Sequence, residues 1–190
     1  MNLDKHQLRT FYKELRAALS DEELEEKSLL VSSNVITFLK DKNELRNFHL
    51  FFPISKQREI NTYPIKDYLD TRESFIYTSR VIDDSLELQT LLLRSNTRFK
   101  KDKWGIPIPL EFEVVGSESI EVVFVPLLAF DHRGNRVGFG KGYYDVLLTG
   151  LKPSVLKIGL SIFPPELRIP AEIHDIPLDY CITPENIITF

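Results

Sequence analysis

The segment from Ile120 to Asp145 decides the fold. It reads Ile-Glu-Val-Val-Phe-Val-Pro-Leu-Leu-Ala-Phe over 120–130 and Asp-His-Arg-Gly-Asn-Arg-Val-Gly-Phe-Gly-Lys-Gly-Tyr-Tyr-Asp over 131–145. The first part is a nearly continuous apolar run, which is typical of a strand buried on both faces of a parallel sheet. The second part holds four of the eight glycines of the chain and leads into a helix-like run from Tyr143 to Leu148. The segment therefore predicts a central strand, a glycine-rich loop and a helix.

The glycine-rich loop is predicted to bind an anion. Glycine in regular structure costs roughly 0.5–1 kcal/mol relative to alanine, so a cluster of glycines indicates a special backbone requirement. Such a backbone can take positive φ, approach a ligand closely and direct several N–H groups at one anion. Arg133, Arg136 and Lys141 add positive charge to the loop. The N-terminus of the following helix would face the same place, which favours phosphate.

The common phosphate-binding motifs do not match this loop. A Walker A loop fails because Asn135 stands at the first glycine and Gly142 at the hydroxyl position, and the dinucleotide pattern fails at Tyr143. Asp145 falls in the first turn of the predicted helix. It is a candidate Mg²⁺ ligand, since Mg²⁺ takes one or two carboxylates together with phosphate oxygens and water. The alternative is an acidic residue that only favours the helix N-terminus.

The run Gly-Asn-Arg-Val-Gly-Phe-Gly-Lys-Gly-Tyr-Tyr-Asp over 134–145 resembles the signature of the 5-formyltetrahydrofolate cyclo-ligase family, also called 5,10-methenyltetrahydrofolate synthetases. The resemblance implies ATP- and Mg²⁺-dependent cyclisation of 5-formyltetrahydrofolate to 5,10-methenyltetrahydrofolate, with phosphorylation of the formyl oxygen and release of ADP and phosphate. The sequence departs from the family pattern at Phe139, where many relatives carry Tyr or Arg. A polar contact from that side chain is therefore not implied.

The resemblance extends to an N-terminal helix over 3–19, in which Lys5 and Arg9 are four residues apart and share a face. Without the resemblance, this pair would be interpreted as a solvated basic face. The implied catalytic residues are Lys141, Arg136 and Tyr143. The implied ATP site consists of Lys5, Arg9, Arg136, Gly138, Phe139, Gly140, Lys141, Gly142, Tyr143, Tyr144 and Asp145. Core packing is the alternative for one of the two adjacent tyrosines.

A folate site is implied beside the ATP site. It consists of Arg9, Ile54, Glu59, Trp104, Phe139, Gly140, Lys141, Gly142 and Tyr143. The carboxylate of Glu59 would accept hydrogen bonds from N–H groups of the pterin ring, although by itself it resembles a surface loop acid. Trp104, the only tryptophan, lies in a basic loop and could stack on a flat ring or pack at the edge of the core.

The C-terminal segment also resembles the family, through a pattern that includes His174, Asp175, Asp179 and Thr183. By this resemblance Asp175 binds Mg²⁺ together with Asp145. His174 would either orient that carboxylate or hydrogen-bond to the backbone. Two other functions stay open: an isomerase or transferase acting on a phosphorylated metabolite, and a non-catalytic nucleotide- or RNA-binding relative.

Composition limits the class of protein. The chain has 190 residues, 24 basic against 28 acidic side chains and a net charge of −4, which gives no electrostatic case for nucleic acid or an anionic membrane. No apolar run reaches the length of a membrane span, and the N-terminus lacks a signal-peptide core. The single cysteine, Cys181, fits a reducing compartment and a buried packing role. We expect a cytoplasmic monomer that acts on small molecules.

Strands alternate with helices along the chain. Apolar runs predict further strands at 48–52, 75–78, 86–93, 156–161 and 180–183, the last closing the chain. A capping box at Ser20 to Glu23 starts a second helix, and a third begins near Pro64. The order predicts one α/β domain over 1–190, with a mostly parallel sheet and helices on both faces. Ligands gather at the carboxyl ends of strands in such sheets, where the 131–145 loop would lie.

Overall fold

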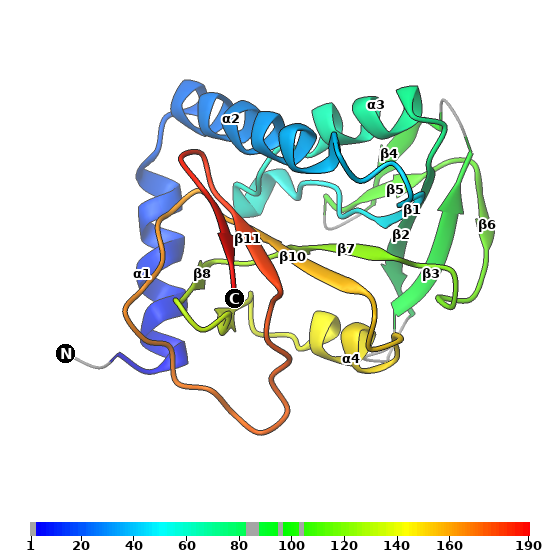
Figure 1. The fold of residues 1–190 in the computed structure, drawn as a ribbon. Helices are drawn as coiled ribbons and strands as arrows, with labels where there is room; N and C mark the ends of the chain where they lie inside the picture. The colour runs from blue at the N-terminus through cyan, green and yellow to red at the C-terminus, as the bar shows by residue number, and fades with distance from the viewer. Residues whose placement is uncertain (1–2, 83–87, 95–96, 103–104) are drawn as a thin grey trace.

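The computed structural model describes residues 3–82, 88–94, 97–102 and 105–190 (Figure 1). The helices are α1 (Lys5–Ala18), α2 (Asp21–Leu39), α3 (Tyr63–Thr71) and α4 (Tyr143–Thr149), with a 3₁₀ turn at Ser55–Gln57. The strands of the main sheet are β1 (Asn47–His49), β2 (Phe75–Val81), β3 (Leu88–Leu93), β6 (Phe112–Val114), β7 (Val122–Pro126), β10 (Leu156–Leu160), β11 (Tyr180–Ile182) and β12 (Ile187–Thr189). Two hairpins stand apart from it, β4 (Phe99–Lys101) with β5 (Pro107–Pro109) and β8 (Ala129–Phe130) with β9 (Arg136–Val137).

The main sheet has eight strands in the order β12-β11-β10-β7-β1-β2-β3-β6. The four central pairs, from β11 to β2, are parallel, and the pairs at both edges are antiparallel. In Figure 1, α2 and α3 cover one face of the sheet, α4 lies on the other, and α1 stands at the end where β8 lies. The predicted α/β class with a mostly parallel sheet is confirmed.

Local sequence fixes the starts of the first two helices. Asp4 and Gln7 form a reciprocal capping box before α1, and Ser20 and Glu23 form the predicted one before α2. Each box satisfies N–H groups that a helix start would otherwise leave without partners. Pro64 occupies the first turn of α3, as predicted. Within the described residues, none of the helices is both long and apolar enough to cross a membrane.

The central strand β7 divides the core into two layers. Val122 and Phe124 pack into the cluster under α2 and α3, whereas Val123 and Val125 join the cluster on the α4 side. Because both faces of the strand are buried, its odd- and even-numbered residues are both apolar in the sequence. Cys181 is fully buried in the α4-side cluster, and burial raises the pKa of its thiol, so its predicted packing role is confirmed.

Two predicted strand boundaries are wrong. The run 120–130 is not one strand: β7 ends at Pro126, and Ala129–Phe130 turns away to pair with Arg136–Val137. Hydropathy does not mark this break, because the apolar residues on both sides of it are buried, and Pro126 is its local signal. The chain also continues past 180–183 into β12, which pairs antiparallel with β11. The hydroxyl of Thr183 accepts N–H groups of Glu185 and Asn186 and closes this turn.

The strand order changes direction between β1 and β7. From β1 the chain passes through α3 to β2 on one side, and from β7 it passes through α4 to β10 on the other. In an open α/β sheet, the carboxyl ends of the strands at such a switch leave a crevice between their departing loops. The loops at this edge are 50–62 after β1, 127–142 after β7 and 161–179 after β10.

The middle of β10 is packed too closely to accept a larger residue at Gly159. A Cβ there would lie 2.6 Å from Leu178 and 2.7 Å from Leu127. We predict that Gly159→Ala lowers the free energy of unfolding by about 1–3 kcal/mol, measured by urea denaturation. Gly150→Ala is the control, because its Cβ would make only ordinary contacts at 3.5 Å or more. Equal stability of the two variants would contradict this account of the packing.

Candidate active site

One face of α1 carries the polar side chains that meet the carboxyl edge of the sheet. Lys5, Arg9, Tyr12 and Arg16 recur at intervals of four, three and four residues, so they form a stripe along the helix. Tyr12 donates to Glu166 in the loop after β10 at 2.7 Å. Leu8 and Tyr12 also pack against the β8–β9 hairpin. The helix is thereby fixed across the edge where the strands end.

Arg9 joins this helix to the glycine-rich loop. Its Nε donates to the carbonyl oxygen of Gly138 at 3.1 Å. At Gly140, where φ is +98°, an added Cβ would lie 3.2 Å from the same Nε. Gly140 therefore provides both an unusual backbone conformation and room for Arg9. The structure brings together the helix and loop residues that the sequence grouped.

Like Arg133, Lys141 is a cation of this loop whose side chain has no partner in the described ranges. It is exposed and makes no hydrogen bond or ion pair with any residue in the described ranges. Gly142, with φ of +75°, is the N-cap of α4, so two glycines flank the lysine in the left-handed region. This backbone leaves Lys141 exposed, directly after Gly140, which lies against Arg9. An anionic ligand could bind both cations.

Arg136 already binds two groups of the protein through its guanidinium. It lies 8% exposed on β9 and donates to the carboxylate of Asp145 at 2.5 Å and to the carbonyl of Ile176. Burial lowers the pKa of the guanidinium, and the nearby carboxylates of Asp145 and Asp175 oppose that shift. Arg136 therefore ties β9 to α4 and to the loop after β10. To contact a phosphate directly, it would have to exchange one of these partners.

Asp175 is paired with Lys5. The Lys5 Nζ lies 2.5 and 2.7 Å from the two carboxylate oxygens, and the Glu172 N–H donates to Oδ2 at 2.6 Å. Burial raises the pKa of Asp175, but these hydrogen bonds and the Lys5 charge outweigh burial and hold it below its ordinary value. His174 lies 3.0 Å from Glu172 rather than on the Asp175 carboxylate.

The carboxylates at this edge can be tested for their fit to Mg²⁺. Asp145 uses only Oδ1 on Arg136, and its Oδ2 makes no hydrogen bond to the part of the chain that is described. A free carboxylate oxygen beside a phosphate site is the type of ligand that Mg²⁺ takes. Asp175 belongs instead to a group with Glu172 and His174, whose ligand atoms lie within 4.8 Å of one another. Asp145 fits directly, whereas Asp175 fits once Lys5 leaves it.

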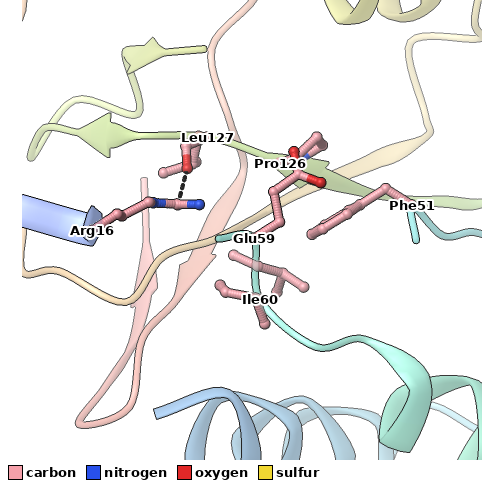
Figure 2. A pocket seen from close by; sticks show the side chains of 7 residues that line it. Arg16, Phe51, Glu59, Ile60, Pro126 and Leu127 are labelled. Atoms are coloured by element: carbon pink, nitrogen blue, oxygen red, sulfur yellow. Dashed lines mark hydrogen bonds between the residues drawn. The ribbon is translucent and has the colours of Figure 1, made fainter. Parts of the chain in front are cut away.

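Glu59 lies in a pocket at the same edge (Figure 2). The pocket is lined by Arg16, Phe51, Glu59, Ile60, Pro126, Leu127 and Leu160. Glu59 is 8% exposed and accepts the Ile54 N–H at 2.8 Å. Burial raises the pKa of its carboxyl to about 7, against the opposing effects of the Ile54 N–H and the Arg16 charge. The surface-acid interpretation of Glu59 is therefore wrong, and Ile54 lies beside it.

The two tyrosines after the glycines have different environments. Tyr144 packs against both core clusters and lies edge-on to His49, with 6.1 Å between ring centroids. Burial raises the pKa of its phenol. Tyr143 is half-buried and makes no side-chain hydrogen bond within the described residues. Core packing of one tyrosine is thus confirmed for Tyr144, while Trp104 lies outside the described residues.

Sequence reasoning missed Arg16. It is 3% exposed, and its guanidinium donates to the carbonyls of Leu127 at 2.5 Å and Arg58 at 3.3 Å. The group also lies 5.7 Å from the centroid of the Phe139 ring, which packs against the α1 cluster. The spacing that linked Lys5 to Arg9 reaches Arg16 two turns later, and extending it would have identified this residue.

The fold and site together are those of an α/β protein that can bind a small anion at the carboxyl edge of its sheet. Comparison with known proteins identifies which one: the model of the 5-formyltetrahydrofolate cyclo-ligase family matches residues 2–184, and the chain belongs to this family of ligases. The family resemblance seen in the glycine loop is thereby confirmed.

Individual relatives agree with this assignment. The 5-formyltetrahydrofolate cyclo-ligase of Mus musculus is 30% identical over 194 residues, covering 94% of this chain and 93% of its own. That of Haemophilus influenzae is 29% identical, covering 94% and 97%. The NMR structure of Aquifex aeolicus 5,10-methenyltetrahydrofolate synthetase has a TM-score of 0.81 and 32% identity, covering 97% of this chain and 92% of that one. The synthetase of Mycoplasma pneumoniae has a TM-score of 0.73 and 25% identity, covering 96% and 99%.

The buried Glu59 carboxyl predicts a pH-dependent stability. Its pKa is about 7 in the folded chain against 4.5 for an ordinary glutamate, so its favourable contribution is complete below pH 4.5 and is lost as pH rises through about 7. We predict that Glu59→Gln gains about 3 kcal/mol in unfolding free energy relative to the parent between pH 4 and pH 8.

Urea denaturation at several pH values measures this difference. Glu14→Gln, on the exposed side of α1, controls for loss of a carboxylate. A Glu59→Gln difference that stays constant across the pH range would contradict the burial of an ionisable Glu59.

Proposed function

We propose that this protein catalyses the ATP- and Mg²⁺-dependent cyclisation of 5-formyltetrahydrofolate to 5,10-methenyltetrahydrofolate, with release of ADP and phosphate. The observation that carries the proposal is the position of α1. It runs from the glycine loop, where Arg9 and Lys141 are available to phosphates, to the pocket that holds Glu59. Two adjacent sites on one helix suit a reaction that must align a nucleotide with a second substrate.

The formyl oxygen is a poor leaving group, so the proposed reaction first activates it by phosphorylation. The formyl oxygen attacks the γ-phosphorus, and the bond from that phosphorus to the β–γ bridging oxygen breaks, so ADP leaves. N10 of the folate then attacks the activated formyl carbon and closes the ring. The carbon–oxygen bond breaks, phosphate departs, and the N10 proton is transferred to it. The formyl oxygen therefore leaves within the phosphate.

The glycine loop neutralises phosphate charge in this proposal. Phosphoryl transfer requires mainly alignment and electrostatic stabilisation, which preorganised cations and N–H groups provide. Lys141, which has no hydrogen bond or ion pair within the described residues, binds the transferring phosphate. Arg9 and the backbone from Gly138 to Gly142 complete the nucleotide site, and Lys5 joins it after exchanging Asp175 for phosphate. Arg136 acts from β9 by holding Asp145 in place.

Asp145 would hold Mg²⁺ through its free carboxylate oxygen, and Asp175 would join it when Lys5 turns to the nucleotide. Bound there, Mg²⁺ would neutralise part of the phosphate charge. This exchange leaves neither side chain without a partner of opposite charge. Lys5 would exchange Asp175 for phosphate, and Asp175 would exchange Lys5 for Mg²⁺.

The folate would lie against the Glu59 pocket. The carboxylate of Glu59 accepts N–H groups of the pterin ring, and Ile54 fixes that carboxylate through its backbone N–H. The pocket leaves no room for a water molecule, so the ring lies at its mouth unless the walls move. Phe139 and Tyr143 flank the path from this mouth to Lys141 in the proposal, and Trp104 is proposed as a further contact.

We predict that Lys141→Ala slows the chemical step about a hundredfold or more, because one transition-state charge contact is lost. Purified protein is mixed with 5-formyltetrahydrofolate, ATP and Mg²⁺ in a single-turnover format, and the near-ultraviolet absorbance of the methenyl product is followed. A reaction without ATP gives the background, and Lys13→Ala, an exposed lysine on α1, is the matched control.

An ATP-dependent rise that only Lys141→Ala loses supports the reaction and the site. Parent-like turnover by Lys141→Ala would remove this residue from the mechanism. No product with folded parent protein would reject the cyclisation and favour a phosphorylated-metabolite enzyme, which a thermal-shift screen of sugar phosphates would then test.

A further inference from the structure

Arg16 and Glu59 face one narrow pocket without touching each other (Figure 2). Each side chain is held by the backbone. Arg16 donates to the carbonyls of Leu127 and Arg58, and Glu59 accepts the N–H of Ile54. The remaining Arg16 nitrogen, Nε, is buried and has no partner among the described residues. Two opposite charges are thus buried side by side with no direct ion pair.

This arrangement is poorly explained by stability alone. Burying a charge costs several kcal/mol, and a stabilising pair needs direct contact and good geometry to offset that cost. Arg16 and Glu59 are each only 3% and 8% exposed, yet their backbone bonds hold them apart. Buried charges kept in this state are more typical of a functional site.

Arg16 also contacts three segments around the pocket. It binds the end of β7 through Leu127 and the loop that carries Glu59 through Arg58. Arg58 returns the contact, since its Nε donates to the Arg16 carbonyl at 2.9 Å. The Arg16 guanidinium lies 5.7 Å from the centre of the Phe139 ring in the glycine loop. One side chain therefore links the strand end, the Glu59 loop and the glycine loop.

We propose that Arg16 is a positioning residue for the folate: across the pocket its charge favours the ionised form of Glu59, and it fixes Glu59 relative to the glycine loop. The inference rests on the proposed function, in which Glu59 accepts N–H groups of the pterin ring. Arg16 acts through Glu59 and makes no contact with the reacting atoms. It should therefore affect folate affinity and leave nucleotide affinity unchanged.

The charge state of Glu59 gives the proposal a specific readout. Its pKa is about 7, because burial raises it and the Ile54 N–H and Arg16 oppose the rise. The groups that face it are Arg16 from α1 and the phenol of Tyr144 from α4, which burial keeps protonated. Without the Arg16 charge, the Glu59 pKa rises further, and the carboxylate that accepts the pterin N–H groups is lost at neutral pH.

The test is calorimetric titration of 5-formyltetrahydrofolate into the full chain from pH 6 to pH 9. For the parent, we expect affinity to fall below about pH 7. For Arg16→Met, the midpoint moves upward by about one pH unit or more, so that affinity at pH 7 falls about fivefold or more and recovers at high pH. The dissociation constant of ATP with Mg²⁺ stays unchanged.

Arg72→Met is the matched control. Like Arg16, Arg72 donates to backbone carbonyls, three in its case, and its guanidinium lies 5.6 Å from the centre of a phenylalanine ring, that of Phe48. Unlike Arg16, it lies at the end of α3, away from Glu59. Both variants lose stability, whereas only Arg16→Met moves the pH midpoint. An unchanged midpoint in Arg16→Met, or the same shift in Arg72→Met, would overturn the proposal.

Arg16→Lys separates charge from geometry and serves also if Arg16→Met does not fold. It keeps a positive charge but cannot bind both carbonyls with a rigid fork. We expect a midpoint near that of the parent with weaker folate binding at every pH, and unchanged folate affinity would overturn the positioning role. Failure of the parent to bind 5-formyltetrahydrofolate at any pH would overturn the proposed function together with this inference, and is distinguishable from a failure of the Arg16 variants alone.

Discussion

The site depends on the docking of α1 across the carboxyl ends of the central strands. A stripe of four polar side chains on this helix reaches the loop after β10, the glycine loop and the end of β7. These loops leave the sheet in different directions, since the strand order reverses between β1 and β7. The loops after β7 and β10 also bond directly, through the Glu166 N–H to Phe130 and the Leu178 N–H to Gly134, and α1 joins both to the Glu59 pocket.

Charge at this edge is arranged as exchangeable pairs. Lys5 holds Asp175 and Arg136 holds Asp145, so both proposed metal ligands are neutralised by cations of the chain. Lys141 and Arg9 make no ion pair with the described residues and remain available to phosphate. Arg16 and Glu59 remain separated by their backbone contacts. Binding of nucleotide, metal and folate can then replace existing contacts without leaving a buried charge uncompensated.

Much of this could be predicted from the sequence, for identifiable reasons. The α/β class followed from apolar runs that alternate with amphipathic helices, and the helix starts followed from local capping residues such as Ser20. The glycine loop followed from composition, and its pairing with Arg9 from the family resemblance. The pairing of Ala129–Phe130 with β9, the burial of Glu59 and the contacts of Arg16 could not be predicted, because each depends on which distant segment packs there. Only helical spacing carried any signal for Arg16.

The central claim is that the site aligns the formyl oxygen of the folate with the γ-phosphate of ATP. The most direct measurement uses 5-formyltetrahydrofolate labelled with oxygen-18 in the formyl group, with mass spectrometry of the phosphate released in unlabelled water. The account predicts one labelled oxygen in each phosphate, since the formyl oxygen leaves with the phosphorus. Unlabelled phosphate, with the label released into water, would contradict it and would mean that ATP is hydrolysed separately from ring closure.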